Sequence, residues 1–106
     1  MDIREISQKI YKYQKKRAVE LKTELTPEII FLHLSEEIGE IARQLVNKNL
    51  SFKIRKYDEE NLKEEIVQAI LDLFTLAECF KIDLEKELPK KITEIMNKKK
   101  EGRDKQ

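Results

Sequence analysis

The chain is poor in the residues that interrupt helices or cross-link small folds. Its 106 residues include two glycines, two prolines, one cysteine and no tryptophan. So few turn-forming residues exclude a fold of many short strands and favour long helices. The single cysteine, Cys79, excludes an intramolecular disulfide and favours a reducing compartment. Because Cys79 lies in an apolar run, we expect it to be a small buried hydrophobic residue and not a nucleophile.

The sequence also lacks an excess of charge of one sign and any long apolar run. Its 22 Lys and Arg balance 21 Asp and Glu, which leaves a net charge of +1. We therefore expect neither nucleic acid nor an anionic membrane as a partner. No apolar run approaches the roughly 18–20 residues of a membrane span, and the first residues do not resemble a signal peptide. These absences predict a cytoplasmic protein.

What the sequence contains in quantity is charged and aliphatic residues, with Asp, Glu, Lys and Arg at 41%. Helix-start signals occur at Thr26-Pro27, at Asp58 and at Asp83. The fold class predicted is all-α and four-helix-bundle-like, in a single domain over residues 1–98 followed by a flexible charged tail over 99–106. The predicted helices span roughly residues 2–21, 27–47, 58–80 and 84–98.

Three acidic residues share one edge of the second predicted helix. At 100° per residue, Glu36, Glu37 and Glu40 fall within an arc of about 100°, beside an apolar stripe. Like charges at this spacing repel by a few tenths of a kcal/mol per pair. Water, Lys or Arg partners, or a divalent cation could offset that repulsion, so a solvated face and a metal site are both open interpretations.

A second polar cluster lies on the third predicted helix. Glu65, Gln68 and Asp72 fall within an arc of about 60°, while apolar residues cover most of the remaining circumference. A helix this apolar needs cover on more than one side, which suggests a homo-oligomer. Antiparallel packing of the two helices would bring their acidic edges together. Oxygen ligands favour Mg²⁺, with Mn²⁺ as an alternative, and hence metal-assisted hydrolysis of a phosphate ester or anhydride.

Three further features have both a structural and a functional interpretation. Lys15, Lys16 and Arg17 either complement the dipole at the end of the first helix or contact phosphate. His33 is either merely structural or touches a bound anion, since it precedes Glu37 by one turn. The basic, partly apolar segment 47–57 is either a connector or a lid that closes over a phosphorylated ligand.

Several ordered motifs resemble one known family. EEIGE at 36–40, Glu65, and IDLE at 82–85 follow one another, with FLHLS at 31–35 ahead of the first acids. In this order they resemble the MazG-type all-α nucleoside triphosphate pyrophosphohydrolases, which carry EExxE, a spacer, ExxD and an IDLE-like turn into a last helix. The resemblance covers roughly Thr26 to Lys91.

The resemblance implies a helical dimer or tetramer that cleaves an NTP or dNTP to the monophosphate and pyrophosphate. It assigns Mg²⁺ binding to Glu37, Glu40 and Glu65, and orientation or deprotonation of the attacking water to Glu36. It also matches Lys91 to the family's phosphate-contacting lysine of the final helix. No covalent intermediate is expected.

The chain departs from the family pattern at three places. Gln68 stands where the Asp of ExxD belongs, and its neutral carbonyl oxygen removes one negative charge from the ligand set. Asp72 lies one turn further along and is the candidate substitute ligand. Lys81 replaces a glycine, and Asn97 is out of register. The alternative hypotheses are a catalytically impaired subunit that binds nucleotide or a protein partner, and a helical adaptor that binds no Mg²⁺.

Overall fold

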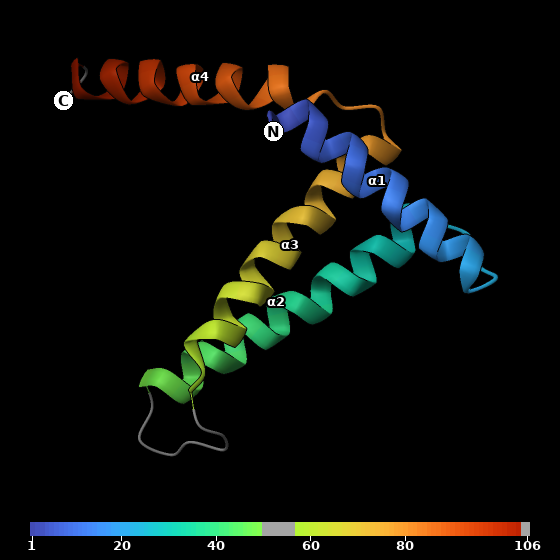
Figure 1. The fold of residues 1–106 in the computed structure, drawn as a ribbon. Helices are drawn as coiled ribbons and strands as arrows, with labels where there is room; N and C mark the ends of the chain where they lie inside the picture. The colour runs from blue at the N-terminus through green and yellow to red at the C-terminus, as the bar shows by residue number, and fades with distance from the viewer. Residues whose placement is uncertain (50–56, 105–106) are drawn as a thin grey trace.

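The computed structural model describes residues 1–49 and 57–104, and this part of the chain is helical without any strand. The all-α prediction is therefore confirmed at that level. Residues 50–56, most of the predicted connector or lid, lie outside the described residues. The four helices are α1 (Ile3–Glu20), α2 (Pro27–Asn49), α3 (Glu59–Cys79) and α4 (Leu84–Asp104), as Figure 1 shows.

Side-chain caps begin the helices where the sequence predicted starts. The Asp58 carboxylate accepts hydrogen bonds from the backbone amides of Glu60 and Asn61, at 3.0 and 3.3 Å. Thr26 Oγ1 accepts from the amide of Ile29 at 3.2 Å. The one large boundary difference is the end of α4, which lies at Asp104 and not at residue 98. Lys, Glu and Arg dominate this extension, and their high helix propensity accounts for it.

A lysine in the left-handed conformation ends α3. Lys81 has φ 56°, and the amide of Ile82 donates to the Ala77 carbonyl at 2.9 Å. The Lys81 amide donates to Glu78 O at 3.0 Å, which completes a Schellman motif. Lys22, with φ 57°, ends α1 in the same way. The position at which the resembled family carries glycine is thus one whose backbone favours glycine.

Helices α2 and α3 form an antiparallel hairpin, α1 packs across α3, and α4 extends away from the hairpin (Figure 1). Arg4 joins the starts of α1 and α4, since its guanidinium lies 3.0 Å from Asp83 Oδ2 and 2.7 Å from Glu85 Oε2. The radius of gyration is 17.7 Å. A compact chain of this length would have about 13 Å. A single chain therefore does not close the predicted bundle around its fourth helix.

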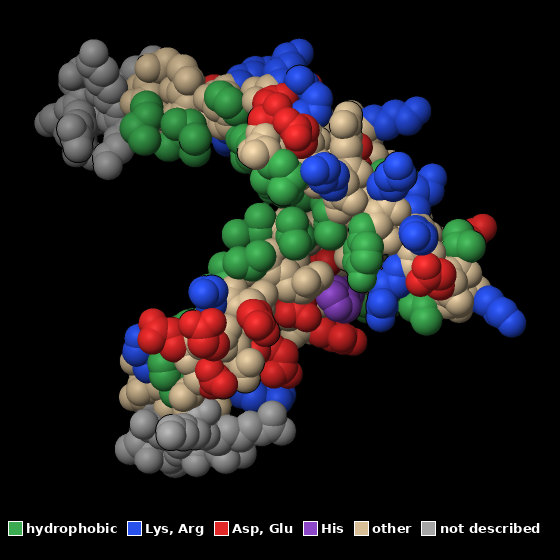
Figure 2. Space-filling model, viewed as in Figure 1, with side chains coloured by type: hydrophobic (Ala, Val, Ile, Leu, Met, Phe, Trp, Pro, Cys, Tyr) green, Lys and Arg blue, Asp and Glu red, His purple; other side chains and the backbone are tan. Residues whose placement is uncertain are grey.

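Few apolar side chains are buried within the described chain. The buried apolar residues are Ala18, Ile30, Leu34, Ala69 and Ala77. Many larger ones stay exposed, and in Figure 2 hydrophobic side chains line the hollow between α3 and α4. On these two helices the exposed set is Ile66, Val67, Ile70, Leu73, Leu88, Ile92, Ile95 and Met96. The apolar excess predicted for α3 is real and continues onto α4.

Two smaller sequence predictions concern Cys79 and the membrane. Cys79 is half-buried, and burial raises the pKa of its thiol above the ordinary value, which disfavours a nucleophilic thiolate. Among the described helices, none combines the length and the apolar character that crossing a bilayer requires.

Candidate functional site

The acidic edge of α2 has the predicted layout. Glu36 is exposed, the Glu37 side chain is 20% exposed, and Glu40 lies 3.3 Å from the Arg43 guanidinium. Figure 2 shows acidic side chains gathered over the α2–α3 hairpin. The Glu40–Arg43 pair is exposed on both sides, so it offsets little of the repulsion between the acids.

Glu65 from α3 joins this edge, as the sequence predicted for antiparallel helices. Burial raises the pKa of the Glu65 carboxyl above its ordinary value, and the charges of Glu40 and Glu37 raise it further. The Gln44 side chain and the charge of Arg43 oppose the shift. Glu65 Oε2 is buried and finds no hydrogen-bond partner among the described residues. The carboxylates of α2 and α3 thus form one electrostatically coupled cluster.

Gln68 lies beside this cluster and not on a separate face. It lines a cavity of about 350 Å³ together with residues of α1 and α2. The other lining residues are Tyr13, Gln14, Arg17, His33 and Glu37. The second predicted cluster therefore faces the first, with the neutral amide of Gln68 at the position where the resembled family has an acid.

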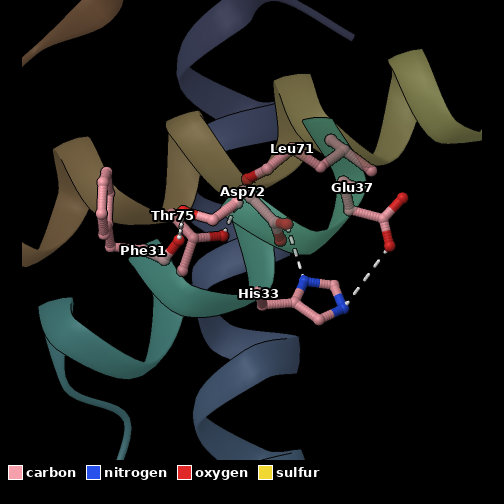
Figure 3. Close-up of polar contacts among 7 residues, drawn as sticks. Phe31, His33, Glu37, Leu71, Asp72 and Thr75 are labelled. Atoms are coloured by element: carbon pink, nitrogen blue, oxygen red, sulfur yellow. Dashed lines mark hydrogen bonds and ion pairs between the residues drawn. The ribbon is translucent and has the colours of Figure 1, made fainter. Parts of the chain in front are cut away.

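His33 bridges the two helices (Figure 3). Its Nδ1 lies 2.7 Å from Asp72 Oδ2, and its Nε2 lies 3.7 Å from Glu37 Oε1. The Asp72 side chain is 3% exposed, so this carboxylate is almost completely removed from solvent. Asp72 was predicted as a substitute metal ligand, and the contact that the structure gives it is with His33.

Lys91 is the predicted site residue that is not brought to the cluster. It lies on α4, its side chain is 70% exposed, and its Nζ is 3.7 Å from Glu94 Oε2. Helix α4 contacts α1 and extends away from the α2–α3 hairpin that carries the acids (Figure 1). Within one chain, Lys91 and the acidic cluster are therefore on separate parts of the molecule.

The donor chemistry of the cluster fits Mg²⁺. Within residues 1–49 and 57–104, no three Asp, Glu, His or Cys side chains already converge as a metal site. Mg²⁺, however, usually keeps several waters and takes only one or two carboxylates together with substrate phosphates. Glu37, Glu40 and Glu65 carry carboxylate oxygens of the kind that Mg²⁺ prefers, and Glu65 Oε2 has no hydrogen-bond partner among the described residues.

Helix α1 contributes residues that sequence reasoning did not assign to the site. Gln14 and Arg17 border the cavity beside His33, as does Tyr13, which is 56% exposed. The run of three cations at 15–17 had indicated a possible phosphate contact for Arg17. Gln14 gave no signal, because its role depends on how α1 crosses the hairpin.

Comparisons of the chain with protein-family models, with curated proteins and with solved structures found no match.

Proposed function

We propose that this chain is an Mg²⁺-dependent nucleotide pyrophosphohydrolase that cleaves an NTP or dNTP to the monophosphate and pyrophosphate, with Mn²⁺ as a substitute ion. The observation that carries the proposal is Glu65, whose buried and unpartnered Oε2 lies in the field of Glu37 and Glu40. Concentrated negative charge of this kind is costly alone and is relieved by a hard cation. The class of reaction rests on the resemblance in motif order.

Each residue has a defined part in the proposed reaction. Glu37, Glu40 and Glu65 would hold Mg²⁺, and Gln68 would add a neutral carbonyl oxygen from the cavity wall. When bound, the ion supplies charge neutralisation on the phosphate bridge. Glu36 is exposed on the same edge, where it orients the attacking water and accepts its proton.

The proposed enzyme is a homo-oligomer, a dimer or a tetramer. Its support is the radius of gyration of 17.7 Å and the exposed apolar residues of α3 and α4. In such an assembly, a lysine contact to the phosphates through Lys91 would have to come from a second copy, because one chain's own Lys91 lies away from the acids. Light scattering of the purified protein tests this, and a monomer at micromolar concentration contradicts it.

The test of the activity is phosphorus NMR on a panel of NTPs and dNTPs with Mg²⁺, against an EDTA control. Glu40→Gln and Glu65→Gln should each lower turnover on the order of 100-fold, because each removes a carboxylate ligand of the Mg²⁺ ion that would neutralise the phosphates in the transition state. Glu60→Gln is the matched control, since Glu60 is an exposed acid on α3 paired with Lys63. If folded protein hydrolyses none of the nucleotides in the panel, the proposal is contradicted.

Gln68 favours a second candidate, an impaired subunit that binds nucleotide or a protein partner without efficient turnover. A neutral ligand weakens the site for a dication, and Gln68 lies at its wall beside Glu37. The variant Gln68→Asp should then tighten Mg²⁺ binding, measured by calorimetry, and turn on hydrolysis. Equal Mg²⁺ affinity in both proteins contradicts a metal role for position 68.

A further inference from the structure

The hydrogen bond between His33 and Asp72 determines which nitrogen of the imidazole is free. His33 Nδ1 lies 2.7 Å from Asp72 Oδ2, and in the usual pairing of a histidine with a carboxylate the Nδ1–H donates to the carboxylate oxygen. In the neutral ring, Nε2 then presents a lone pair. Buried carboxylates that orient histidines in this way fix both the tautomer and the ring plane. Asp72 therefore makes His33 Nε2 an acceptor with a fixed direction.

His33 Nε2 points toward the cavity wall that Glu37 also lines, and Glu37 Oε1 is a second acceptor there. Nε2 lies 3.7 Å from Glu37 Oε1, beyond hydrogen-bond distance for the two atoms. Two acceptors side by side are satisfied by a donor that enters between them. The surrounding cavity of about 350 Å³ is lined by the neutral polar side chains of Tyr13, Gln14 and Gln68 and by Arg17. This lining suits a hydroxyl-bearing or amine-bearing group.

A second, more apolar cavity is also lined by His33. It measures about 220 Å³ and shares Gln14, Arg17 and His33 with the first. Its apolar wall consists of Ala18, Leu21, Leu25, Ile29 and Ile30. Cavities that enclose a whole drug-sized ligand are about 300–1,000 Å³, so this smaller one suits a group the size of a single heterocycle.

We propose that these neighbouring cavities, lined by residues of α1, α2 and α3, bind the nucleoside part of the substrate, and that Asp72 is the positioning residue that presents His33 Nε2 to it. This inference rests on the proposed function, because the phosphates would extend from Glu37 toward Glu65. It also replaces the metal role predicted for Asp72. Asp72 and Glu65 are separated by about 10 Å along α3, whereas Mg²⁺ ligands lie about 2 Å from the ion.

The chain offers a direct spectroscopic test, because His33 is its only histidine. Imidazole nitrogen NMR of the full chain in EDTA reports Nε2 without overlap. Adenosine, guanosine, cytidine and thymidine are titrated separately as probes. At least one should shift the His33 Nε2 resonance, and Ile29→Trp should abolish that shift by filling the apolar cavity. Ile29 is 45% exposed, so this variant leaves the core intact.

Kinetics then separate a positioning role from a metal role. Asp72→Asn should give mixed His33 tautomers and raise KM for the preferred nucleotide about 3- to 10-fold, the loss expected for one hydrogen bond. Its kcat and Mg²⁺ affinity should stay within about twofold of wild type. Asp58→Asn is the control, since it makes the same change on α3 at an N-cap where Asn serves equally well.

The outcomes distinguish this inference from the activity itself. Turnover without any nucleoside effect on His33, or a fall in Mg²⁺ affinity in Asp72→Asn, overturns the inference and leaves the proposed enzyme standing. A nucleoside shift at His33 without turnover supports the cavity and overturns the enzyme. If neither a His33 shift nor turnover is observed, both the inference and the proposed enzyme are overturned. The wild-type titration and Ile29→Trp decide the matter even where Asp72→Asn does not fold.

Discussion

The apolar stripes of the α2–α3 hairpin and of α4 differ in how far they are covered. Helices α2 and α4 are both amphipathic and of similar length, yet Ile30 and Leu34 of α2 are each 5% exposed, whereas Ile92 and Met96 of α4 are 57% and 60% exposed. Helices α2 and α3 pack on one another within the chain, whereas α4 contacts α1 and leaves its own apolar stripe exposed. An apolar stripe therefore predicts that a helix will be covered, but it does not identify the element that covers it.

The largest effect should come from breaking the hairpin core. Leu34→Ala should cost about 2–5 kcal/mol in the free energy of unfolding, because a buried leucine leaves a cavity. Ile92→Ala on α4 is the counterpart, and in a monomer it should cost less than about 0.5 kcal/mol. Urea denaturation followed by circular dichroism measures both.

Measurements at several protein concentrations sharpen the comparison between Leu34→Ala and Ile92→Ala. If a second copy covers α4, the cost of Ile92→Ala rises with protein concentration, since assembly stabilises only the folded chain. A cost for Leu34→Ala no larger than that for Ile92→Ala in dilute solution would contradict the described packing.

A smaller effect is expected at the junction between the two regions. Lys81→Gly should stabilise the protein by about 0.5–1 kcal/mol, because Lys81 has φ 56° and glycine adopts this conformation without steric cost. Thermal unfolding measures the change. Lys86→Gly, inside α4, is the control and should destabilise by about 1 kcal/mol or less. The prediction fails if Lys81→Gly lowers Tm.

Glu65→Gln should stabilise the metal-free protein by a few tenths of a kcal/mol at neutral pH and low salt. The folded state raises the pKa of Glu65, so the native chain keeps its proton over a pH range where the unfolded chain has lost it. Stability therefore falls as pH rises from the ordinary glutamate pKa through the raised value. Denaturation across this range should show the dependence in wild type and a weaker one in Glu65→Gln.

The smallest effect should come from the exposed contact between α1 and α4. The hydrogen bond from Arg4 lowers the pKa of Asp83. The contact therefore stabilises the folded protein above the ordinary aspartate pKa, and this stabilisation is lost as pH falls through the lowered value. Arg4→Met should lower Tm slightly at low salt and not at about 1 M salt, where screening extends only about 3 Å. A salt-independent loss would indicate that the aliphatic part of Arg4, and not its charge, holds α4.

Local signals accounted for much of the fold. Thr26 and Asp58 cap the helices that they were predicted to start, since capping depends on residues two or three positions away. Helical periodicity put Glu65 and Gln68 on one edge, and the antiparallel hairpin turned that edge toward Glu37. The extent of α4 beyond residue 98 was missed, because a charged helix end carries no boundary signal.

What the sequence by itself determined is the helical content, the helix starts and the grouping of acids on two helix edges, because all of these follow from neighbours within one or two turns. The tertiary structure alone decided that Asp72 hydrogen-bonds to His33, that Gln14 borders the same cavity, and that α4 carries Lys91 away from the acids. Those facts depend on how helices far apart in the chain cross one another, and helical periodicity carries no information about the crossing.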